Sequence, residues 1–130
     1  MQYIGQLDKN KLGKYKDKIK TLDVIITNER IEHIKKHHPS LINNELKFIK
    51  KVLEYPDYIL EDRKNINTII MIKNIINNNK NYIMIVKLNT NKDYKEKSNT
   101  IISFWNISKK KLGQYIRNGE IIFKKLDKHE

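Results

Sequence analysis

The stretch that decides the fold is residues 68–88, TIIMIKNIINNNKNYIMIVKL. It contains two apolar runs rich in β-branched residues, 68–76 and 82–88, and each run has the composition of a strand. Residues 77–80, NNNK, lie between the two runs. Because asparagine tolerates the left-handed backbone geometry of a tight turn, the stretch predicts an antiparallel β-hairpin.

Four further strands are expected, on both sides of this hairpin in the sequence. Each is a short apolar or β-branched run bounded by polar residues. Their predicted ranges are 22–26, 58–60, 100–107 and 120–124.

Three helices are expected as well. Thr27 and Glu29 form a helix start signal, with a capping hydroxyl and an acid in the first turn. Pro39 ends this first helix, because the residue before a proline avoids the α region. Apolar residues at helical spacing predict a second helix over 40–54, and a serine cap and a later Asn-Gly stop predict a third over 108–117.

This order of elements predicts an α+β fold. The N-terminal helices would pack on a four- to five-stranded antiparallel meander sheet, followed by a short C-terminal helix and strand. We expect residues 1–130 to form a single domain. Within it, 1–20 would be a weakly patterned lead-in with a short helix at about 12–19, and 21–126 would form the core.

Composition limits the function classes. The chain has 130 residues, 27 Lys and Arg against 15 Asp and Glu, and a formal net charge of +12. Such a basic domain attracts polyanions such as RNA and DNA. The absence of cysteine excludes disulfides, zinc knuckles and thiol nucleophiles. With no apolar stretch near the ~18 residues of a membrane span and no signal-peptide pattern, we expect a cytoplasmic protein without membrane contact.

The arginines are more informative than the lysines. Close to half of the chain is Lys, Asn or Ile, which is typical of A/T-rich coding sequence, so the charge alone is weak evidence for a nucleic-acid ligand. Arg30, Arg63 and Arg117 are the only arginines. Where lysine is so common, an arginine is a candidate for planar, bidentate contact with a phosphate or carboxylate.

Three of the four histidines lie within six residues: His33, His37 and His38. His33 and His37 are four apart and share a helix face, a spacing used by two-histidine metal sites, but no third ligand is evident. They could also be exposed groups on a basic helix, or an acid–base pair, since histidine titrates near neutral pH. The sequence leaves these three interpretations open.

The predicted strands carry further polar groups. Lys87 shares a strand face with Ile83 and Ile85, and it must snorkel, find a partner or serve a ligand. Strict alternation places Ser103 on one face and Thr100 on the other. No glycine-rich phosphate loop, nucleophile elbow or carboxylate cluster is present, so an enzyme acting on a phosphodiester is expected to need no metal.

Five motifs, taken together and in order, resemble the phage-associated group of barnase–EndoU–colicin–RelE-like nucleases. They are VIITNERIEHIKKHHP at 24–39, VLEYPDYILED at 52–62, IVKL at 85–88, NTIIS at 99–103 and QYIRNGEIIFKK at 114–125. The resemblance covers about residues 20–126. It implies helices with a four-stranded antiparallel sheet, a nucleic-acid cleft on the sheet face and metal-independent ribonuclease activity.

The resemblance also implies the site. Its catalytic positions fall on His33, His38, Lys87, Thr100, Ser103 and Arg117. Lys87 replaces the usual arginine, which keeps the charge but loses the bidentate fork. Further candidates for substrate binding are Lys36, His37, Arg63, Lys73 and Tyr115. No metal or other cofactor is expected.

The leading hypothesis is therefore an endoribonuclease that cleaves RNA through its 2′-hydroxyl to leave a 2′,3′-cyclic phosphate. RNA would be the partner, and a cognate inhibitor or immunity protein a further one. Two alternatives remain: a weakly active or inactive RNA- or DNA-binding module, and a toxin-like protein that acts mainly through a protein partner.

Overall fold

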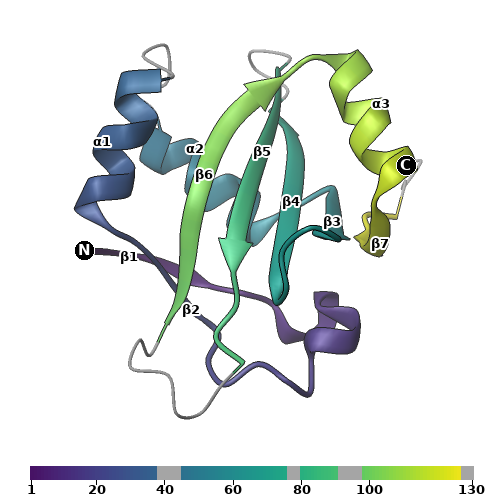
Figure 1. Ribbon diagram of the computed structural model, residues 1–130, viewed down its shortest axis with the longest axis horizontal. Helices are drawn as coiled ribbons and strands as arrows, with labels where there is room; N and C mark the ends of the chain where they lie inside the picture. The colour runs from purple at the N-terminus through teal and green to yellow at the C-terminus, as the bar shows by residue number, and fades with distance from the viewer. Residues whose placement is uncertain (38–44, 76–79, 91–97, 127–130) are drawn as a thin grey trace.

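A computed structural model describes residues 1–37, 45–75, 80–90 and 98–126. Its strands form one seven-stranded sheet with the order β1-β2-β6-β5-β4-β3-β7 (Figure 1). The strands are β1 (Gln2–Gln6), β2 (Asp23–Ile26), β3 (Tyr58–Glu61), β4 (Thr68–Ile75), β5 (Lys80–Lys87), β6 (Asn99–Ile107) and β7 (Glu120–Lys124). The helices are α1 (Asn28–His37), α2 (Glu45–Glu54) and α3 (Lys109–Asn118).

The individual elements agree with the sequence-based ranges. Each predicted strand corresponds to one of β2–β7 within two residues at either end. The hairpin is confirmed by the antiparallel pairing of β4 with β5, which runs from Thr68 opposite Lys87 to Ile75 opposite Lys80. The turn residues 77–79 and the expected start of the second helix at 40–44 lie outside the described residues.

The predicted fold class is wrong. The sheet has seven strands rather than four or five, and it is mixed, because β2 pairs in parallel with β6. The chain passes through α1, α2, β3, β4 and β5 between these two neighbours. Hydrophobic periodicity reports which segments are strands, but it does not report a partner that lies so far away along the chain.

The N-terminal lead-in also differs from expectation. Residues 2–6 form β1, which pairs with β2. Two short 3₁₀ helices, Lys9–Lys11 and Gly13–Tyr15, follow in place of the expected helix at 12–19. The side chains of Ile4, Leu7 and Leu12 are buried in the main core. Only one residue of β1 is fully buried, so the sequence carries little strand signal there.

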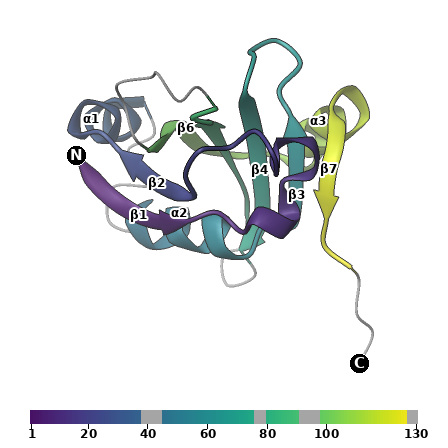
Figure 2. The same cartoon turned by 90° about the horizontal axis from the view of Figure 1, so that it is seen from below.

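The two faces of the sheet are unequal, as Figures 1 and 2 show from perpendicular directions. On the back face, α2 covers the larger core, in which Ile49 and Leu53 pack with Met71 and Met84. On the front face, α3 covers a smaller cluster of Leu60, Ile70, Ile72 and Ile83. Among the described residues, no helix covers the front face between α1 and α3, and side chains of this face line surface cavities.

A buried amide joins the parallel strands. The Asn99 side chain is fully buried; its nitrogen donates to the carbonyl oxygens of Thr21 and Asp23, both at 2.9 Å. Its oxygen accepts from the backbone nitrogen of Asn89 at 2.8 Å. The three bonds join β6 to the backbone just before β2 (Thr21), at the start of β2 (Asp23) and just after β5 (Asn89). They fix the register of the parallel pair.

We expect Asn99→Ala to lower the free energy of unfolding by about 3 kcal/mol, because it leaves buried backbone groups without a partner. Urea unfolding followed by circular dichroism measures this. Asn106→Ala on the same strand is the control and should cost less than half as much. Equal costs for the two variants would contradict the role assigned to Asn99.

Two glycines should respond in opposite ways to alanine. Gly13 has φ of +54°, and an added Cβ would lie 2.7 Å from Cγ2 of Ile122, so Gly13→Ala should destabilise the fold by about 2 kcal/mol. Gly113 lies inside α3, where a Cβ meets only the flexible end of Arg117 at 3.3 Å. Gly113→Ala should stabilise by about 0.5–1 kcal/mol. Thermal unfolding of both variants checks the opposite signs.

Candidate functional site

A β-bulge decides which polar side chains meet on the front face. Ile85 pairs with Ser103 and Val86 with Ile101, so Ile102 is an extra residue of β6 at this point. The extra residue shifts the alternation, and Thr100 and Ser103 both lie on the front face. The expectation that they point to opposite faces is wrong, because strict alternation does not hold across a bulge.

Lys87 and Thr100 pair directly across β5 and β6. They line a cavity of about 420 Å³ together with Arg30 of α1 and Asn67 of the segment before β4. Lys87 and Arg30 are both exposed, while Thr100 is half-buried. The lining also includes the carboxylate of Glu29, so the cavity combines two cations and the Thr100 hydroxyl with one acid. The cations and the hydroxyl are groups that bind a phosphate.

The position of α1 follows from the parallel strand pair. Ile25 pairs with Thr100, and α1 begins three residues later at Asn28, so the helix runs beside the second half of β6. The Thr27 hydroxyl accepts from the backbone nitrogen of Arg30 at 3.1 Å, which confirms the predicted helix start. Ile34 is buried and fixes the rotation of the helix.

This rotation brings the histidine side of α1 to the front. Arg30, His33 and His37 are spaced i, i+3 and i+7, so they share one side of the helix. Since Arg30 lines the cavity that contains Lys87 and Thr100, this side of the helix borders the front face. The rings of His33 and His37 are both exposed, and their centroids lie 4.4 Å apart with the planes tilted by 51°. His38 lies outside the described residues.

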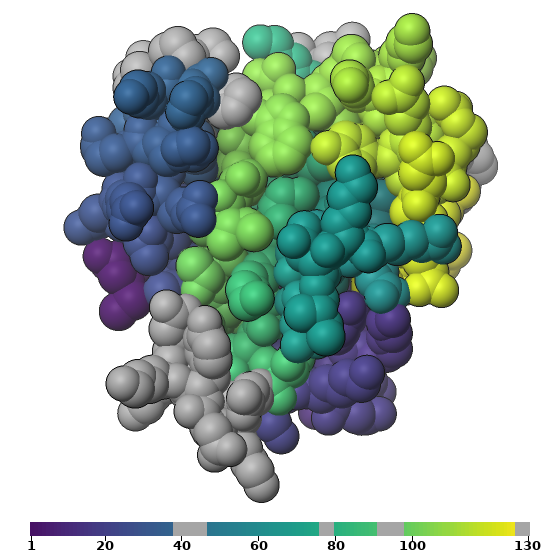
Figure 3. Space-filling view, in the orientation of Figure 1, coloured from purple at the N-terminus to yellow at the C-terminus, as the bar shows by residue number. Residues whose placement is uncertain are grey.

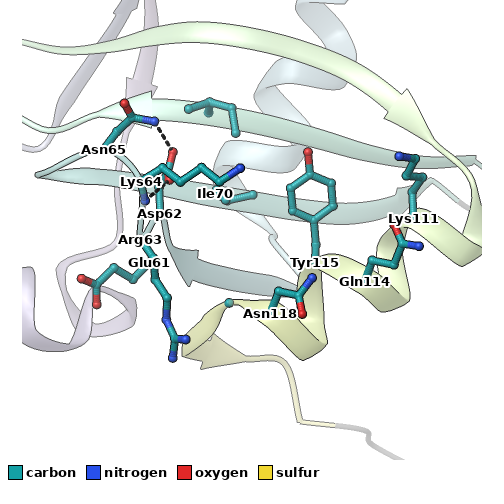
Figure 4. A pocket seen from close by; sticks show the side chains of 12 residues that line it. Glu61, Asp62, Arg63, Lys64, Asn65, Ile70, Lys111, Gln114, Tyr115 and Asn118 are labelled. Atoms are coloured by element: carbon teal, nitrogen blue, oxygen red, sulfur yellow. Dashed lines mark hydrogen bonds between the residues drawn. The ribbon is translucent and has the colours of Figure 1, made fainter.

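A second cavity, of about 380 Å³, lies between α3 and the 62–67 segment that joins β3 to β4 (Figure 4). Ile70 and Ile85 contribute from the strands. One wall comes from Lys111, Gln114, Tyr115 and Asn118 of α3, and the other from Asp62, Arg63, Lys64 and Asn65. The Tyr115 ring stands toward the strands, and Arg63 points away from it.

Glu61 also borders this second cavity, but it is engaged elsewhere. The ammonium group of Lys14 lies 2.6 Å from its carboxylate. This contact holds the pKa of the Glu61 carboxyl below its usual range and raises the pKa of Lys14. The carboxylate therefore stays ionised at neutral pH and ties the N-terminal turns to the end of β3 instead of acting in the cavity.

The two cavities are neighbours on the front face. Ile85 lines one and Lys87 lines the other, and they are two residues apart on the same face of β5. In the space-filling view, β5 and β6 are exposed between α1 and the 62–67 segment (Figure 3). The cations that line the two cavities are Arg30, Arg63, Lys64, Lys87 and Lys111.

Of the described sequence candidates, four line one of these two cavities: Arg63, Lys87, Thr100 and Tyr115. Six others line neither: His33, Lys36, His37, Lys73, Ser103 and Arg117. Lys73 lies in register with buried Tyr82 of the back core, where its ammonium group is 3.8 Å from Asp57. Arg117 is exposed on α3, but its guanidinium lies against Gly113, on a different side of the helix from Tyr115 and Asn118. Lys36 is exposed on α1, one turn after His33.

Arg30 was missing from the predicted site, although the sequence had marked it as one of three arginines. Its position beside Lys87 depends on the β2–β6 pairing, which local patterns do not report. Within the described parts of the chain, no three His, Cys, Asp or Glu residues gather in a way that could hold a metal ion. No helix in those parts is long and apolar enough to cross a membrane.

The family of the chain follows from a match over residues 30–130 to the phage MuF C-terminal domain. The chain belongs to this family. The match begins at Arg30, so this MuF C-terminal domain includes most of α1 and every later element that lines the front face. Phage association, as expected from the sequence, is supported. No curated protein and no solved structure matches the chain significantly.

Proposed function

We propose that this MuF C-terminal domain is an endoribonuclease that works without a metal ion, with its active centre on the front face between α1 and β5–β6. The observation that carries the proposal is the cavity shared by Arg30, Lys87 and Thr100, together with the imidazole pair of His33 and His37 at the i+3 and i+7 positions from Arg30 on α1. Cations, hydroxyls and an imidazole that can donate or accept a proton are the parts that metal-free phosphodiester cleavage requires.

The reaction has one bond-forming and one bond-breaking event. A base takes the proton of a ribose 2′-hydroxyl, and the 2′-oxygen forms a bond to the adjacent phosphorus. The bond from phosphorus to the 5′-oxygen breaks, and an acid protonates that oxygen. The products are a 2′,3′-cyclic phosphate and a 5′-hydroxyl, and DNA resists cleavage because it has no 2′-hydroxyl.

In this scheme His33 moves a proton, as base or as acid. Arg30 and Lys87 bind the phosphate oxygens, whose negative charge grows in the transition state, and Thr100 and Ser103 donate hydrogen bonds to them. Arg30 provides the planar fork that Lys87 lacks. His37, in ring contact with His33, is exposed on the same side of α1 and borders the path of the substrate.

The test is cleavage of RNA and of an all-deoxy oligonucleotide in excess EDTA. Native protein should release cyclic-phosphate ends from RNA only. His33→Ala should lose at least ~100-fold in rate, because general acid–base groups contribute about that much or more. Lys47→Gln, on α2 behind the sheet, is the control and should cleave normally, with unchanged unfolding midpoints for both variants.

Equal cleavage by native protein and His33→Ala would overturn the proposal. Tight, salt-dependent RNA binding without cleavage would favour the non-catalytic binding module instead. Absence of both would favour a protein that acts through a protein partner, such as an inhibitor.

A second test separates the two arginines. The resemblance implies that Arg117 is catalytic, whereas the front cavity contains Arg30. We expect Arg30→Ala to lower kcat/KM for RNA by about 100-fold, the usual effect of removing one donor to a developing oxyanion. Arg117→Ala should change it less than three-fold. The reverse ranking, measured on folded variants, would place the phosphate contact at α3.

A further inference from the structure

The cavity between α3 and the 62–67 segment lies beside the proposed phosphate site, because side chains of β5 line both cavities. Ile85 lines it, and Lys87, two residues later on the same face of β5, lines the phosphate cavity. Two residues of a strand span about 7 Å, which is comparable with the length of one nucleotide. A strand of RNA with its phosphate at Lys87 would therefore present a neighbouring base to this cavity.

The cavity has the chemistry of a nucleobase site. Ile70 and Ile85 supply apolar side chains from the strands, and the half-buried Tyr115 supplies an aromatic ring beside them. Amide and ammonium groups surround this apolar part: Gln114 and Asn118 on α3, and Lys64 across from them (Figure 4). A planar ring with a polar edge uses both parts, since bases stack on aromatic side chains and are read along their edges.

Both walls are held in place before any ligand arrives. Asp62 accepts hydrogen bonds from the backbone of Lys64 at 2.9 Å and from the Asn65 amide at 3.0 Å, and this fixes the 62–67 segment. At the end of α3, Gly119 approaches Leu60 so closely that an added Cβ would lie 3.1 Å from its side chain. This close packing sets α3, and Tyr115 with it, against the sheet.

The donors on the rim favour one kind of base. Lys64 and Lys111 only donate hydrogen bonds, whereas the amides of Gln114 and Asn118 can donate or accept. Guanine and uracil present carbonyl oxygens where adenine and cytosine present amino groups. The carboxylate of Asp62 also lines the cavity, but its oxygens already accept from the Lys64 backbone and the Asn65 amide. A rim with these ammonium donors therefore accepts a carbonyl edge more readily than an amino edge.

We propose that the cavity between α3 and the 62–67 segment is a nucleobase subsite that stacks a guanine or uracil on Tyr115 and contacts its carbonyl edge through Lys64. The proposal rests on the proposed ribonuclease function, because it places the base next to the phosphate that would be cleaved.

The test measures binding, so it does not depend on cleavage. The probes are fluorescein-labelled 2′-O-methyl pentanucleotides with four adenines and a central guanine, uracil, adenine, cytosine or abasic residue. Fluorescence anisotropy with native protein should give at least about five-fold tighter binding for guanine or uracil than for the abasic probe, since one stacked base contributes about that much or more. Adenine and cytosine should also bind about five-fold more weakly than guanine or uracil, because they stack but present an amino group to the donors of the rim. Tyr115→Leu should bind all five probes like the abasic one.

A matched pair of charge variants controls for electrostatics and folding. Lys64→Gln and Lys110→Gln each remove one positive charge, but Lys110 lies on α3 outside the cavity lining. Lys64→Gln should reduce the base preference at least three-fold, and Lys110→Gln should leave it unchanged. Tyr115 also packs against the apolar cluster under α3, so its replacement can affect folding. The double variant Gln114→Ala/Asn118→Ala therefore tests the polar rim while the Tyr115 ring stays in place.

The outcomes separate the subsite from the nuclease. Equal affinity for all five probes, or a preference that survives both Tyr115→Leu and Lys64→Gln, overturns the subsite whether or not RNA is cleaved. A base preference that depends on these residues supports the subsite even if His33→Ala refutes the proposed chemistry.

Discussion

The arrangement of the front face depends on the buried amide of Asn99. Its three hydrogen bonds hold the start of β2 against β6 and set the parallel register. Because α1 continues directly from β2, that register also decides where the helix lies beside β6. A buried amide is costly unless its donors and acceptor are satisfied, so this position tolerates few other side chains. One polar side chain in the core thus positions Arg30, His33 and His37 on the surface.

The back face of the sheet contributes most of the buried core, and the front face carries the polar groups proposed to bind RNA. The back face buries a large apolar core under α2, in which the Tyr82 ring stacks on Phe48 and on Phe104. The front face has a smaller core under α3, and polar groups replace apolar ones toward α1. The bulge at Ile102 serves this second face, since it places both β6 hydroxyls on the side where Lys87 lies. The backbone irregularity is therefore part of the site and not a defect of the sheet.

Several candidate residues were identified from the sequence, but their grouping was not. Lys87, Thr100, Ser103 and Tyr115 do lie on the front face, as a sheet-face cleft would require. Lys73 does not, because its strand alternation turns it to the back, toward Asp57. Arg30 entered the site instead, through a helix whose position depends on a non-local strand pair. The match to the phage MuF C-terminal domain gives the family, and the chemistry of the front face is the basis of the proposed activity.

In the described part of the chain, the sequence by itself determined the secondary structure from residue 23 onward. Strand runs, a capping threonine and turn-forming residues act over a few neighbouring positions, and those local preferences are written directly in the chain. Only the tertiary structure decided the mixed sheet, the strand β1, the bulge and which residues lie next to each polar side chain. These features arise from pairings between distant segments, such as β2 with β6 and β3 with β7, whose energies depend on the packing of the whole core.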